Sequence, residues 1–292
     1  MQIYINKPNN SLYELCISDI NVSVTTEYVK QISKSDNIEV INFTNKFNSK
    51  INLSDNTCVK KIFFETGSKF TRNLDSLPQS LEYLEIVRGK FSKTIDNLPL
   101  QLKVLIIGNS FNKPVDNLPS SLERLCISGY FNQPIDNLPS SLLYLNLNCG
   151  YLKHPINNLP NQLKTLFLDN YKLNIDRLPI SLKTLNLTNY YEKINNLPDS
   201  ITYLNSDVNN LIDFLVEFPK SLEVLELYSY SMYTNQIKLE IILNKLPKSI
   251  KYVSIIANNL ISFVSSNPNH IFFRDDECRS ECNKYKYKIL FN

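Results

Sequence analysis

Histidine and glycine are scarce in this sequence, with two histidines and five glycines among 292 residues. Histidine is the side chain that enzymes most often use as a general acid or base, and it is a frequent metal ligand. The glycines stand singly, so no Gly-rich loop is present to cradle a phosphate group. We therefore expect a protein that is not an enzyme, with no catalytic residue, no cofactor and no metal.

Strong charge and long apolar runs are also absent. The net charge of +3 gives no overall attraction to nucleic acid or to an anionic membrane, and no run approaches the roughly 20 apolar residues of a membrane span. Residues 1–8 lack the charged start and apolar core of a secretory signal. Without such a signal, the six irregularly spaced cysteines are expected to be reduced thiols. These absences predict an intracellular, cytoplasmic protein, in the host cytoplasm if the source is viral, with neither nucleic acid nor a membrane as its partner.

Two groups of residues resemble metal sites, and each lacks an essential part. His270, Cys278 and Cys282 offer three zinc ligands, whereas a structural zinc site usually has four ligands in two close pairs. Aspartates also recur along the chain, at Asp75, Asp96, Asp116, Asp136 and Asp176. No second acidic row or Gly-rich loop accompanies them, as a calcium site would require. We predict instead that each aspartate accepts hydrogen bonds from nearby backbone N–H groups of its own repeat unit. The neighbouring asparagines would do the same, or would form a ladder of stacked amides along the convex edge of the repeat array.

A repeat dominates the sequence. Residues 111–122, FNKPVDNLPSSL, return as residues 131–142, FNQPIDNLPSSL, with two differences. A six-residue frame of the form apolar-x-x-apolar-x-apolar recurs twelve times along the chain. The frames begin at Leu12, Ile38, Val59, Leu81, Leu102, Leu122, Leu142, Leu163, Leu182, Ile201, Leu222 and Ile250. Self-similarity at a fixed period indicates a solenoid, in which each added unit extends one continuous core.

Each frame predicts one short strand, because apolar residues alternate over its last four positions. Most frames follow a Leu-Pro step, and proline keeps that segment extended or turn-like. Most steps between frames are 19 to 22 residues, too short for a strand, two turns and a full helix. The predicted fold is therefore mainly β, a right-handed leucine-rich-repeat-like solenoid of about 12 turns. Its parallel sheet would lie on the concave face and extended or 3-10 segments on the convex side, with few short helices near the ends.

The whole chain, residues 1–292, is expected to form a single solenoid domain. Residues 1–58 would form irregular N-terminal turns or a cap, residues 59–228 the regular repeats, and residues 229–292 an irregular last turn and a C-terminal cap. Terminal units of a solenoid are usually atypical, because each of them has a neighbour on one side only.

The ends of the chain also carry weaker signals. Residues 25–33 and 236–243 are candidates for short helices, and both lie where the step between frames is long. Residues 284–291 alternate between polar and apolar side chains and predict a last strand that closes the edge of the sheet. The lysines of this strand would discourage further edge pairing.

Recurring slots predict the core and the register of the strands. In the turn that begins at Leu122, the inward slots are Leu122, Leu125, Ile127, Phe131, Ile135 and Leu138. The phenylalanine slot predicts a ladder of Phe47, Phe70, Phe91, Phe111 and Phe131, followed by Leu152. The second frame position alternates in sign over Glu39, Lys60, Glu82, Lys103 and Glu123. Opposite charges on neighbouring strands attract, so this row favours in-register stacking.

Residues 131–142 resemble the FNIP repeat, a family found mainly in slime moulds and in large DNA viruses of amoebae. The resemblance covers residues 60–205 well, and residues 12–59 and 206–256 loosely. The Leu-Pro-x-x-Leu-x-x-Leu-x-Ile/Val pattern is also similar to short bacterial leucine-rich repeats. The resemblance implies a scaffold and no reaction. Many viral FNIP proteins resemble F-box adapters of ubiquitin ligases, but the first frame here begins at Leu12 and leaves no room for an F-box ahead of it.

The residues best suited to a partner occupy the third and fifth frame positions, which point out of the concave face of the sheet. The candidates are Tyr83, Val104, Ile106, Arg124, Cys126, Tyr144, Asn146 and Phe167. Tyrosine, phenylalanine and arginine are enriched at binding hot spots, and an exposed aromatic patch usually marks an interaction surface. Tyrosine, valine and phenylalanine are also good strand formers, which is the structural alternative. We expect a monomeric, non-enzymatic scaffold that binds a protein partner. The alternatives are the substrate-recognition part of an F-box-type ubiquitin-ligase adapter and a structural or virion component.

Overall fold

The structure, a computed structural model, describes residues 4–6, 14–17, 39–207, 211, 217–229, 241–257, 270–274 and 285–291. For residues 4–6, 14–17, 229, 255–257, 270–274 and 285–291 it describes the backbone alone. The chain divides into two compact units. The first unit contains Met1–His154 and Asn158–Pro160, and the second contains Pro155–Asn157 and Asn161–Asn292.

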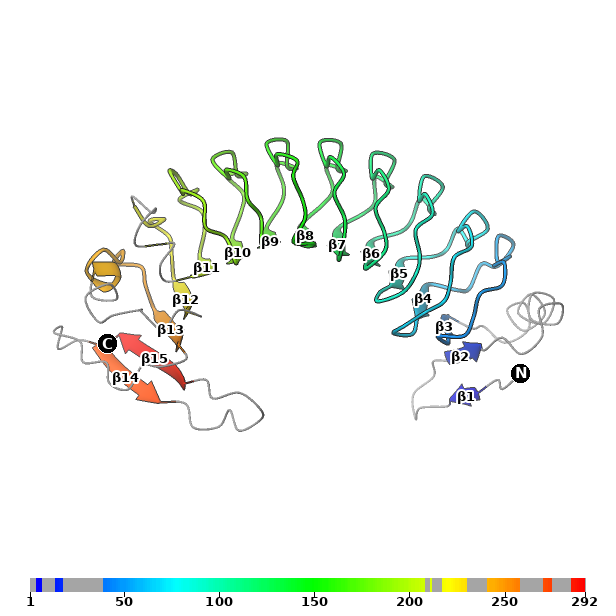
Figure 1. The fold of residues 1–292 in the computed structure, drawn as a ribbon, viewed down its shortest axis with the longest axis horizontal. Coiled ribbons are helices and arrows are strands. Elements are labelled where there is room, and N and C mark those ends of the chain that lie inside the picture. Colours follow the sequence, from blue (N-terminus) through cyan, green and yellow to red (C-terminus); the bar gives the residue numbers. More distant parts are fainter. Residues whose placement is uncertain are drawn as a thin grey trace. The chain divides into compact units, whose positions relative to one another are not determined.

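The first unit is built on a parallel sheet with one strand per turn (Figure 1). Its strands are β1 (Tyr4–Asn6), β2 (Glu14–Ile17), β3 (Val40–Phe43), β4 (Lys61–Phe64), β5 (Tyr83–Ile86), β6 (Val104–Ile107), β7 (Arg124–Ser128) and β8 (Tyr144–Asn148). Strands β2 to β8 pair in parallel, each with the next. Strand β1 adds an antiparallel partner to β2, which the repeat pattern did not predict.

The second unit continues the pattern and ends with antiparallel strands. Its strands are β9 (Thr165–Asp169), β10 (Thr184–Thr188), β11 (Tyr203–Asp207), β12 (Val224–Ser229), β13 (Tyr252–Ala257), β14 (His270–Arg274) and β15 (Tyr285–Phe291). Strands β9 to β13 pair in parallel, β15 pairs antiparallel with β13, and β14 pairs antiparallel with β15. The strand predicted over residues 284–291 is therefore confirmed, but it does not close the sheet, because β14 lies beyond it.

Each of the twelve frames yields one strand, and each of these strands begins at the third residue of its frame. The frame at Leu81 gives β5 from Tyr83, and the frame at Leu102 gives β6 from Val104. Equivalent residues face one another across the sheet, as Leu84 faces Leu105. The continuously described residues 39–207 contain nine of these strands, β3 to β11, so the solenoid has about nine regular turns and the prediction of about 12 was slightly high.

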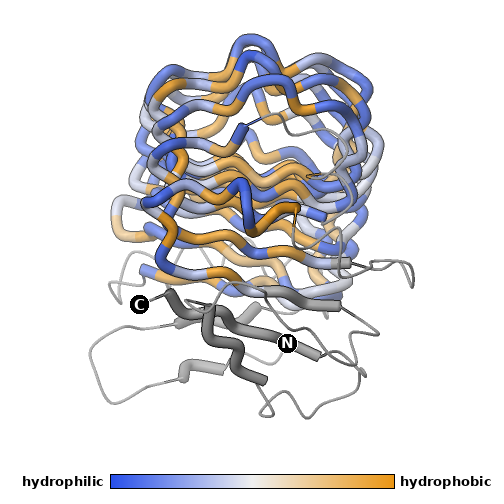
Figure 2. Tube along the Cα trace, turned by 90° about the vertical axis from the view of Figure 1, so that its left-hand side faces the viewer, coloured by the Kyte–Doolittle hydropathy of each residue, from blue (hydrophilic) through white to orange (hydrophobic). Residues whose placement is uncertain are grey.

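The core lies between the sheet and the return loops, and apolar and polar residues alternate along the turns (Figure 2). Phe70, Phe91, Phe111 and Phe131 are all fully buried. The rings of Phe91 and Phe111 are nearly parallel, with centroids 6.3 Å apart, and those of Phe111 and Phe131 are 6.1 Å apart. The predicted phenylalanine ladder is confirmed. It continues as Leu152 in the first unit, and in the second unit Tyr171 and Tyr190 are buried in the equivalent slot.

The Leu-Pro-Ser-Ser-Leu segment forms a tight turn that bonds to the preceding repeat. The N–H of Leu122 donates to the carbonyl of Pro119 over 3.0 Å, which closes the turn. The hydroxyl of Ser121 donates to the carbonyl of Leu102 over 2.8 Å. The same hydroxyl bond recurs from Ser80, Ser141, Ser181 and Ser200. Serine in this slot therefore joins one turn to the turn before it.

A left-handed residue follows the strand in most turns. The slot is filled by Gly67, Arg88, Asn109, Gly129, Gly150, Asn170 and Asn189, with φ between 49° and 86°. Glycine and asparagine tolerate this conformation better than other residues do. At Gly129 the neighbouring turn also lies close, because a Cβ would come within 2.5 Å of the Asn109 Cα.

The aspartates bond to the next turn, rather than to backbone N–H groups of their own turn as predicted. The Nδ2 of Asn117 donates to Asp96, that of Asn137 to Asp116, and that of Asn158 to Asp136, each over 3.1 Å. In the second unit, Asn195 Nδ2 lies 3.0 Å from Asp176 Oδ2. The predicted ladder along the convex edge is thus a ladder of amide donors and carboxylate acceptors.

The alternating charge row is present as ion pairs at the start of the strands. Lys60 Nζ lies 3.2 Å from Glu39, and Lys103 Nζ lies 2.9 Å from Glu82. The same slot pairs Lys251 with Glu223 in the second unit. Because these side chains are exposed, each pair contributes roughly 0–1 kcal/mol.

One of the two predicted short helices lies partly within the described residues. Residues 241–244 are helical and overlap the end of the candidate segment, residues 236–243. The candidate helix over residues 25–33 lies outside the described residues, as do Cys278 and Cys282. The return segments of the described turns contain single tight turns and extended backbone, with no 3-10 helix.

Candidate functional site

Seven of the eight predicted site residues lie on the exposed face of the parallel sheet in the first unit. They lie on β5 to β8, at the third and fifth frame positions, and are Tyr83, Val104, Ile106, Arg124, Cys126, Tyr144 and Asn146. Arg124 is exposed and the other six are half-buried, while the residues between them face the core. We call these seven residues, together with Phe63 and Glu85, the sheet face. The eighth predicted residue, Phe167, lies on β9 in the second unit, opposite Asn186 of β10.

Tyr83 is fixed at one end of the sheet face by two contacts. Its hydroxyl donates to Glu85 Oε2 over 2.5 Å, and its ring lies 4.9 Å from that of Phe63. Burial raises the pKa of Tyr83 above its ordinary value, and the hydrogen bond to Glu85 raises it further. The phenol therefore remains a neutral donor at physiological pH. The proposed site omitted Phe63 and Glu85, although both occupy the fifth frame position that pointed to Cys126 and Asn146.

Arg124 is positioned at the other end by the aromatic ring of the next strand. Its Cζ lies 3.8 Å from the centroid of the Tyr144 ring, and Arg124 and Tyr144 face each other in the register of β7 and β8. Such stacking favours a cation over the negative face of the ring. The guanidinium also forms a hydrogen bond with the Cys126 side chain.

Apolar side chains occupy the strand between these two anchors. Val104 of β6 faces Tyr83 on one side and Arg124 on the other, and Ile106 faces Glu85 and Cys126. The sheet face thus has an apolar centre flanked by Tyr83 with Glu85 and by Arg124 with Tyr144. This arrangement of an apolar centre with polar and aromatic margins is typical of protein-binding surfaces.

The thiol of Cys126 is unsuited to nucleophilic chemistry. Burial raises the pKa of Cys126, and this outweighs the hydrogen bond to Arg124, which lowers it. A reactive cysteine instead needs a lowered pKa, because the thiolate is the nucleophile. Cys58, Cys126 and Cys149 form no disulfide. Among the residues that the structure describes, no group of three or more histidine, cysteine, aspartate or glutamate side chains is placed to hold a metal ion.

The second unit repeats one element of this arrangement on its own sheet. The hydroxyl of Tyr203 donates to Glu226 Oε2 over 2.6 Å, and Asn205 Nδ2 donates to the same oxygen over 3.1 Å. Burial and the bond to Glu226 raise the pKa of Tyr203 to about 12. A tyrosine paired with a glutamate therefore occurs on both sheets, but the second unit has no counterpart of Arg124 stacked on a tyrosine within its described strands β9 to β13.

Comparison with known proteins supports the repeat type. The family model for the FNIP Repeat matches residues 111–150. No curated protein matches the chain. No helix within the described ranges is long and apolar enough to cross a membrane.

Solved structures with leucine-rich repeats are similar to the chain. CroV588 from a giant virus, a circular leucine-rich-repeat protein, is 25% identical with a TM-score of 0.47, over 76% of this chain and 40% of its own. YopM from Yersinia enterocolitica is 20% identical with a TM-score of 0.42, over 65% of this chain and 48% of its own. The functional domain of InlJ from Listeria monocytogenes is 14% identical with a TM-score of 0.47, over 94% of this chain and 59% of its own. The chain therefore spans less than two thirds of the length of each of these three.

The stacked turns, the parallel sheet and the phenylalanine ladder agree with the sequence motif. Within the matched residues, Phe111 and Phe131 lie in the core, and the Leu-Pro steps at Pro119 and Pro139 form the return turns. Residues 111–150 thus match the FNIP Repeat, and the described turns form a leucine-rich-repeat-like solenoid.

Proposed function

We propose that this protein is a non-enzymatic scaffold that binds a protein partner on the sheet face of its first unit. The observation that carries the proposal is the apolar centre of Val104 and Ile106, held between two aromatic anchors whose positions are already fixed. The return loops repeat nearly the same residues from turn to turn, whereas these positions differ between neighbouring strands of the sheet face.

Fixed side chains favour binding because less conformational freedom is lost when a partner arrives. Immobilising a flexible side chain at an interface costs about 0.5–1.5 kcal/mol. Tyr83 is already restrained by its hydrogen bond to Glu85 in the free protein, and Arg124 by its stacking on Tyr144. Less conformational freedom is therefore left to lose when a partner binds. Tyrosine and arginine are also the residue types that most often dominate binding energy.

The sheet face also indicates what the partner contributes. An apolar side chain of the partner would cover Ile106, which has no polar atom to satisfy. A carboxylate or carbonyl oxygen would accept from Arg124, whose guanidinium has five N–H donors. The two margins differ in charge, with Glu85 at one end and Arg124 at the other, so the partner would bind in one orientation.

Affinity purification from the native cell tests this proposal when variants are compared. Tyr83, Arg124 and Tyr144 are replaced together by alanine, and a control variant carries Q79A, Q101A and S120A on exposed return-loop positions of the same unit. We expect the wild type and the control to recover the same protein, and the sheet-face variant to lose it with an unchanged circular dichroism spectrum.

Three outcomes would count against the proposal. Retention of every recovered protein by the sheet-face variant would overturn binding at this surface. Recovery of a Skp1-like subunit by all three proteins would favour the ubiquitin-ligase adapter instead. Detection of this protein in purified virus particles, without a separate binding partner, would favour a structural component.

A further inference from the structure

Positive charge is concentrated in four consecutive loops of the first unit, away from the sheet face. The loops cover residues 45–50, 66–73, 87–94 and 108–114, which follow β3, β4, β5 and β6. They contain eight basic residues, Lys46, Lys50, Lys69, Arg72, Arg88, Lys90, Lys93 and Lys113. All eight are exposed. The acidic Glu65 lies directly before the second loop, where its carboxylate accepts from the N–H of Asn45 over 3.1 Å. Because the whole chain has a net charge of only +3, this surface, which we call the basic edge, is more positive than the composition suggests.

The four loops are stacked in register, so their charges form rows. The N–H of Lys69 donates to the carbonyl of Asn45 over 3.0 Å, and that of Lys90 to the carbonyl of Ser68 over 3.1 Å. Arg72, Lys93 and Lys113 each lie two residues after a ladder phenylalanine. The rings of that ladder are 6.0 Å apart between Phe70 and Phe91, and 6.3 Å apart between Phe91 and Phe111. One basic residue therefore recurs in every turn along this row, and the core rings of successive turns are about 6 Å apart.

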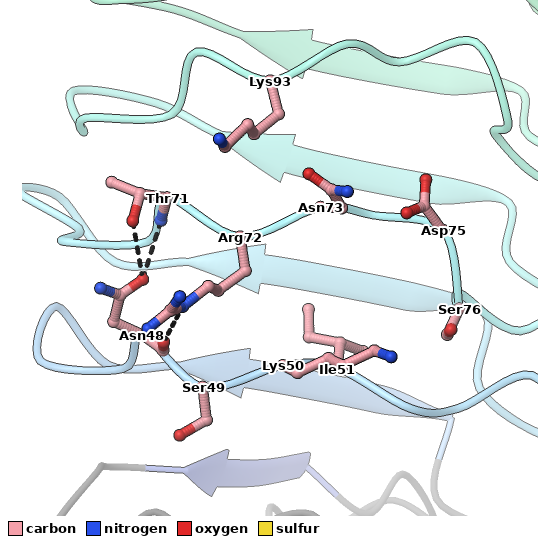
Figure 3. Close-up of a pocket in the computed structure, with 10 residues that line it drawn as sticks. All are labelled: Asn48, Ser49, Lys50, Ile51, Thr71, Arg72, Asn73, Asp75, Ser76 and Lys93. Carbon is pink, nitrogen blue, oxygen red and sulfur yellow. Dashed lines mark hydrogen bonds between the residues drawn. The ribbon is translucent and has the colours of Figure 1, made fainter.

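A pocket opens in the first part of the row (Figure 3). It has a volume of about 680 Å³, and its lining includes Lys50, Arg72 and Lys93 with a single acidic residue, Asp75. The Nε of Arg72 donates to the carbonyl of Asn48 over 3.0 Å, which holds the guanidinium against the wall. Lys50, Arg72 and Lys93 come from three successive turns, so an occupant that contacts all three must run along the solenoid.

The cations of the basic edge are not neutralised within the described part of the chain. The ion pairs found there use Lys60, Lys103, Lys220 and Lys251, none of which belongs to the basic edge. Like charges held about 6 Å apart repel one another, and a bound anion relieves that repulsion. The surface is thus suited to a ligand with several negative charges in a line.

The spacing favours an extended acidic peptide. Alternate residues of an extended chain point to the same side and lie about 6.6–6.8 Å apart, close to the 6.0–6.3 Å separation of the ladder rings. A single-stranded nucleic acid would need exposed aromatic rings on which its bases stack. The aromatic residues of these four loops are Phe47, Phe70, Phe91 and Phe111, and all four are buried.

We propose that the basic edge binds an extended acidic protein segment, with carboxylates at alternate residues facing Arg72, Lys93 and Lys113. This inference is independent of the sheet face, because none of its residues belongs to that surface. The segment lies along the turns, and the pocket at Lys50 receives a side chain near one end of it.

The test compares two fluorescent peptides of roughly twelve residues and equal composition, in which aspartate and serine either alternate or are arranged as Asp-Asp-Ser-Ser repeats, which place a carboxylate on one side only at every fourth residue. Binding to the full-length protein is measured by anisotropy at about 50 mM salt, where screening is modest. We expect the alternating peptide to bind at least about threefold more tightly, because only its carboxylates match the row.

Variants with equal changes in net charge distinguish binding at the basic edge from a general electrostatic attraction to the protein. One variant carries R72E, K93E and K113E, and the control carries K164E, K183E and K193E on exposed lysines of the second unit. The first variant loses three exposed ion pairs with the peptide and gains repulsion, so its affinity for the alternating peptide should fall at least about tenfold. The affinity of the control should stay within about twofold of that of the wild type. The sheet-face variant with alanine at positions 83, 124 and 144 should bind the peptide normally, so the two proposals can fail separately.

Three results would overturn the inference. These are equal binding of the two peptides, equal loss in the two charge variants, and the absence of binding by the wild type. Tighter binding of an oligothymidylate with the same number of charges would assign the basic edge to nucleic acid instead.

Discussion

The guanidinium of Arg124 lies over the ring of Tyr144 on the neighbouring strand, with Cζ 3.8 Å from the ring centroid. An exposed pair of this kind contributes about 0.5–1 kcal/mol. In a double-mutant cycle with Arg124→Gln and Tyr144→Leu, urea unfolding should give a coupling energy of that size. A coupling energy near zero would show that the two side chains are not held together in solution.

Phe111 should be among the most sensitive positions of the first unit. It is fully buried and stacked between Phe91 and Phe131. Phe111→Ala should lower the free energy of unfolding by about 3–5 kcal/mol, because it leaves a cavity inside the ladder. Leu100→Ala is the control, since Leu100 is 75% exposed, and it should change stability by less than about 0.5 kcal/mol. Similar losses at both positions would argue against the ladder as the core of the turn.

Two glycines in the same slot should differ in their response to alanine. Gly67 and Gly129 both have positive φ, so alanine is strained at either position. A Cβ at Gly67 meets nothing within 4 Å, whereas one at Gly129 would lie 2.5 Å from backbone atoms of Asn109. Gly129→Ala should therefore cost at least about 1 kcal/mol more than Gly67→Ala, as measured by thermal or urea unfolding. Equal costs would mean that backbone strain alone decides the residue in this slot.

The two serines of residues 120 and 121 should not be equivalent. Ser121 donates to the carbonyl of Leu102 over 2.8 Å, whereas Ser120 is exposed. Ser121→Ala should cost about 1 kcal/mol, because the carbonyl loses its donor, and Ser120→Ala should be neutral. The comparison is made by urea unfolding of the two single variants. The reverse order of costs would contradict the assignment of the inter-turn bond to Ser121.

Alkaline pH should destabilise the second unit. Burial raises the pKa of Tyr171 and of Tyr203 to about 12. Each phenol thus binds its proton more tightly in the folded than in the unfolded chain, where tyrosine titrates near 10. The resulting stabilisation is complete below about pH 10 and is lost as the pH rises towards 12. Circular dichroism and phenolate absorbance over this range should follow one transition.

A tyrosine variant checks the origin of that transition. Tyr203→Phe should make the alkaline loss of stability shallower, because one titrating phenol is removed. Tyr151→Phe, at a position that is 56% exposed, should leave the transition unchanged. An alkaline transition that is identical in wild type and Tyr203→Phe would mean that this phenol is not linked to folding.

The periodic part of the fold could be predicted because each frame determines its strand locally. Every strand from β2 to β13 begins at the third residue of a frame, since alternation and the Leu-Pro step recur in each turn. What the pattern missed depends on contacts between turns. Asp96, for example, bonds to Asn117 of the next turn and not to its own backbone. The distance between stacked turns decides between these two partners, and the sequence does not give that distance. Similarly, nothing in the alternation of residues 285–291 places β14 beyond β15.

The sheet face was predicted in position but not in its internal contacts. The third and fifth frame positions locate Tyr83, Arg124 and Tyr144 because side chains alternate across a strand. The pairing of Tyr83 with Glu85 and the stacking of Arg124 on Tyr144 require rotamers that alternation cannot specify. Net charge did not predict the basic edge, because it sums over the whole chain, whose acidic residues lie mostly in other slots.

The bond from Ser121 to Leu102 has a consequence for the length of the chain. Its donor and acceptor occupy equivalent slots in neighbouring turns, as do those of the bond from Asn137 to Asp116. A turn with serine, aspartate and asparagine in these slots therefore offers the same donors to the turn before it and the same acceptors to the turn after it, so such turns can follow one another in any number. Gene duplication or deletion of whole 20-residue cassettes, such as residues 122–141, would conserve every one of these joints while changing the number of strands available to a partner.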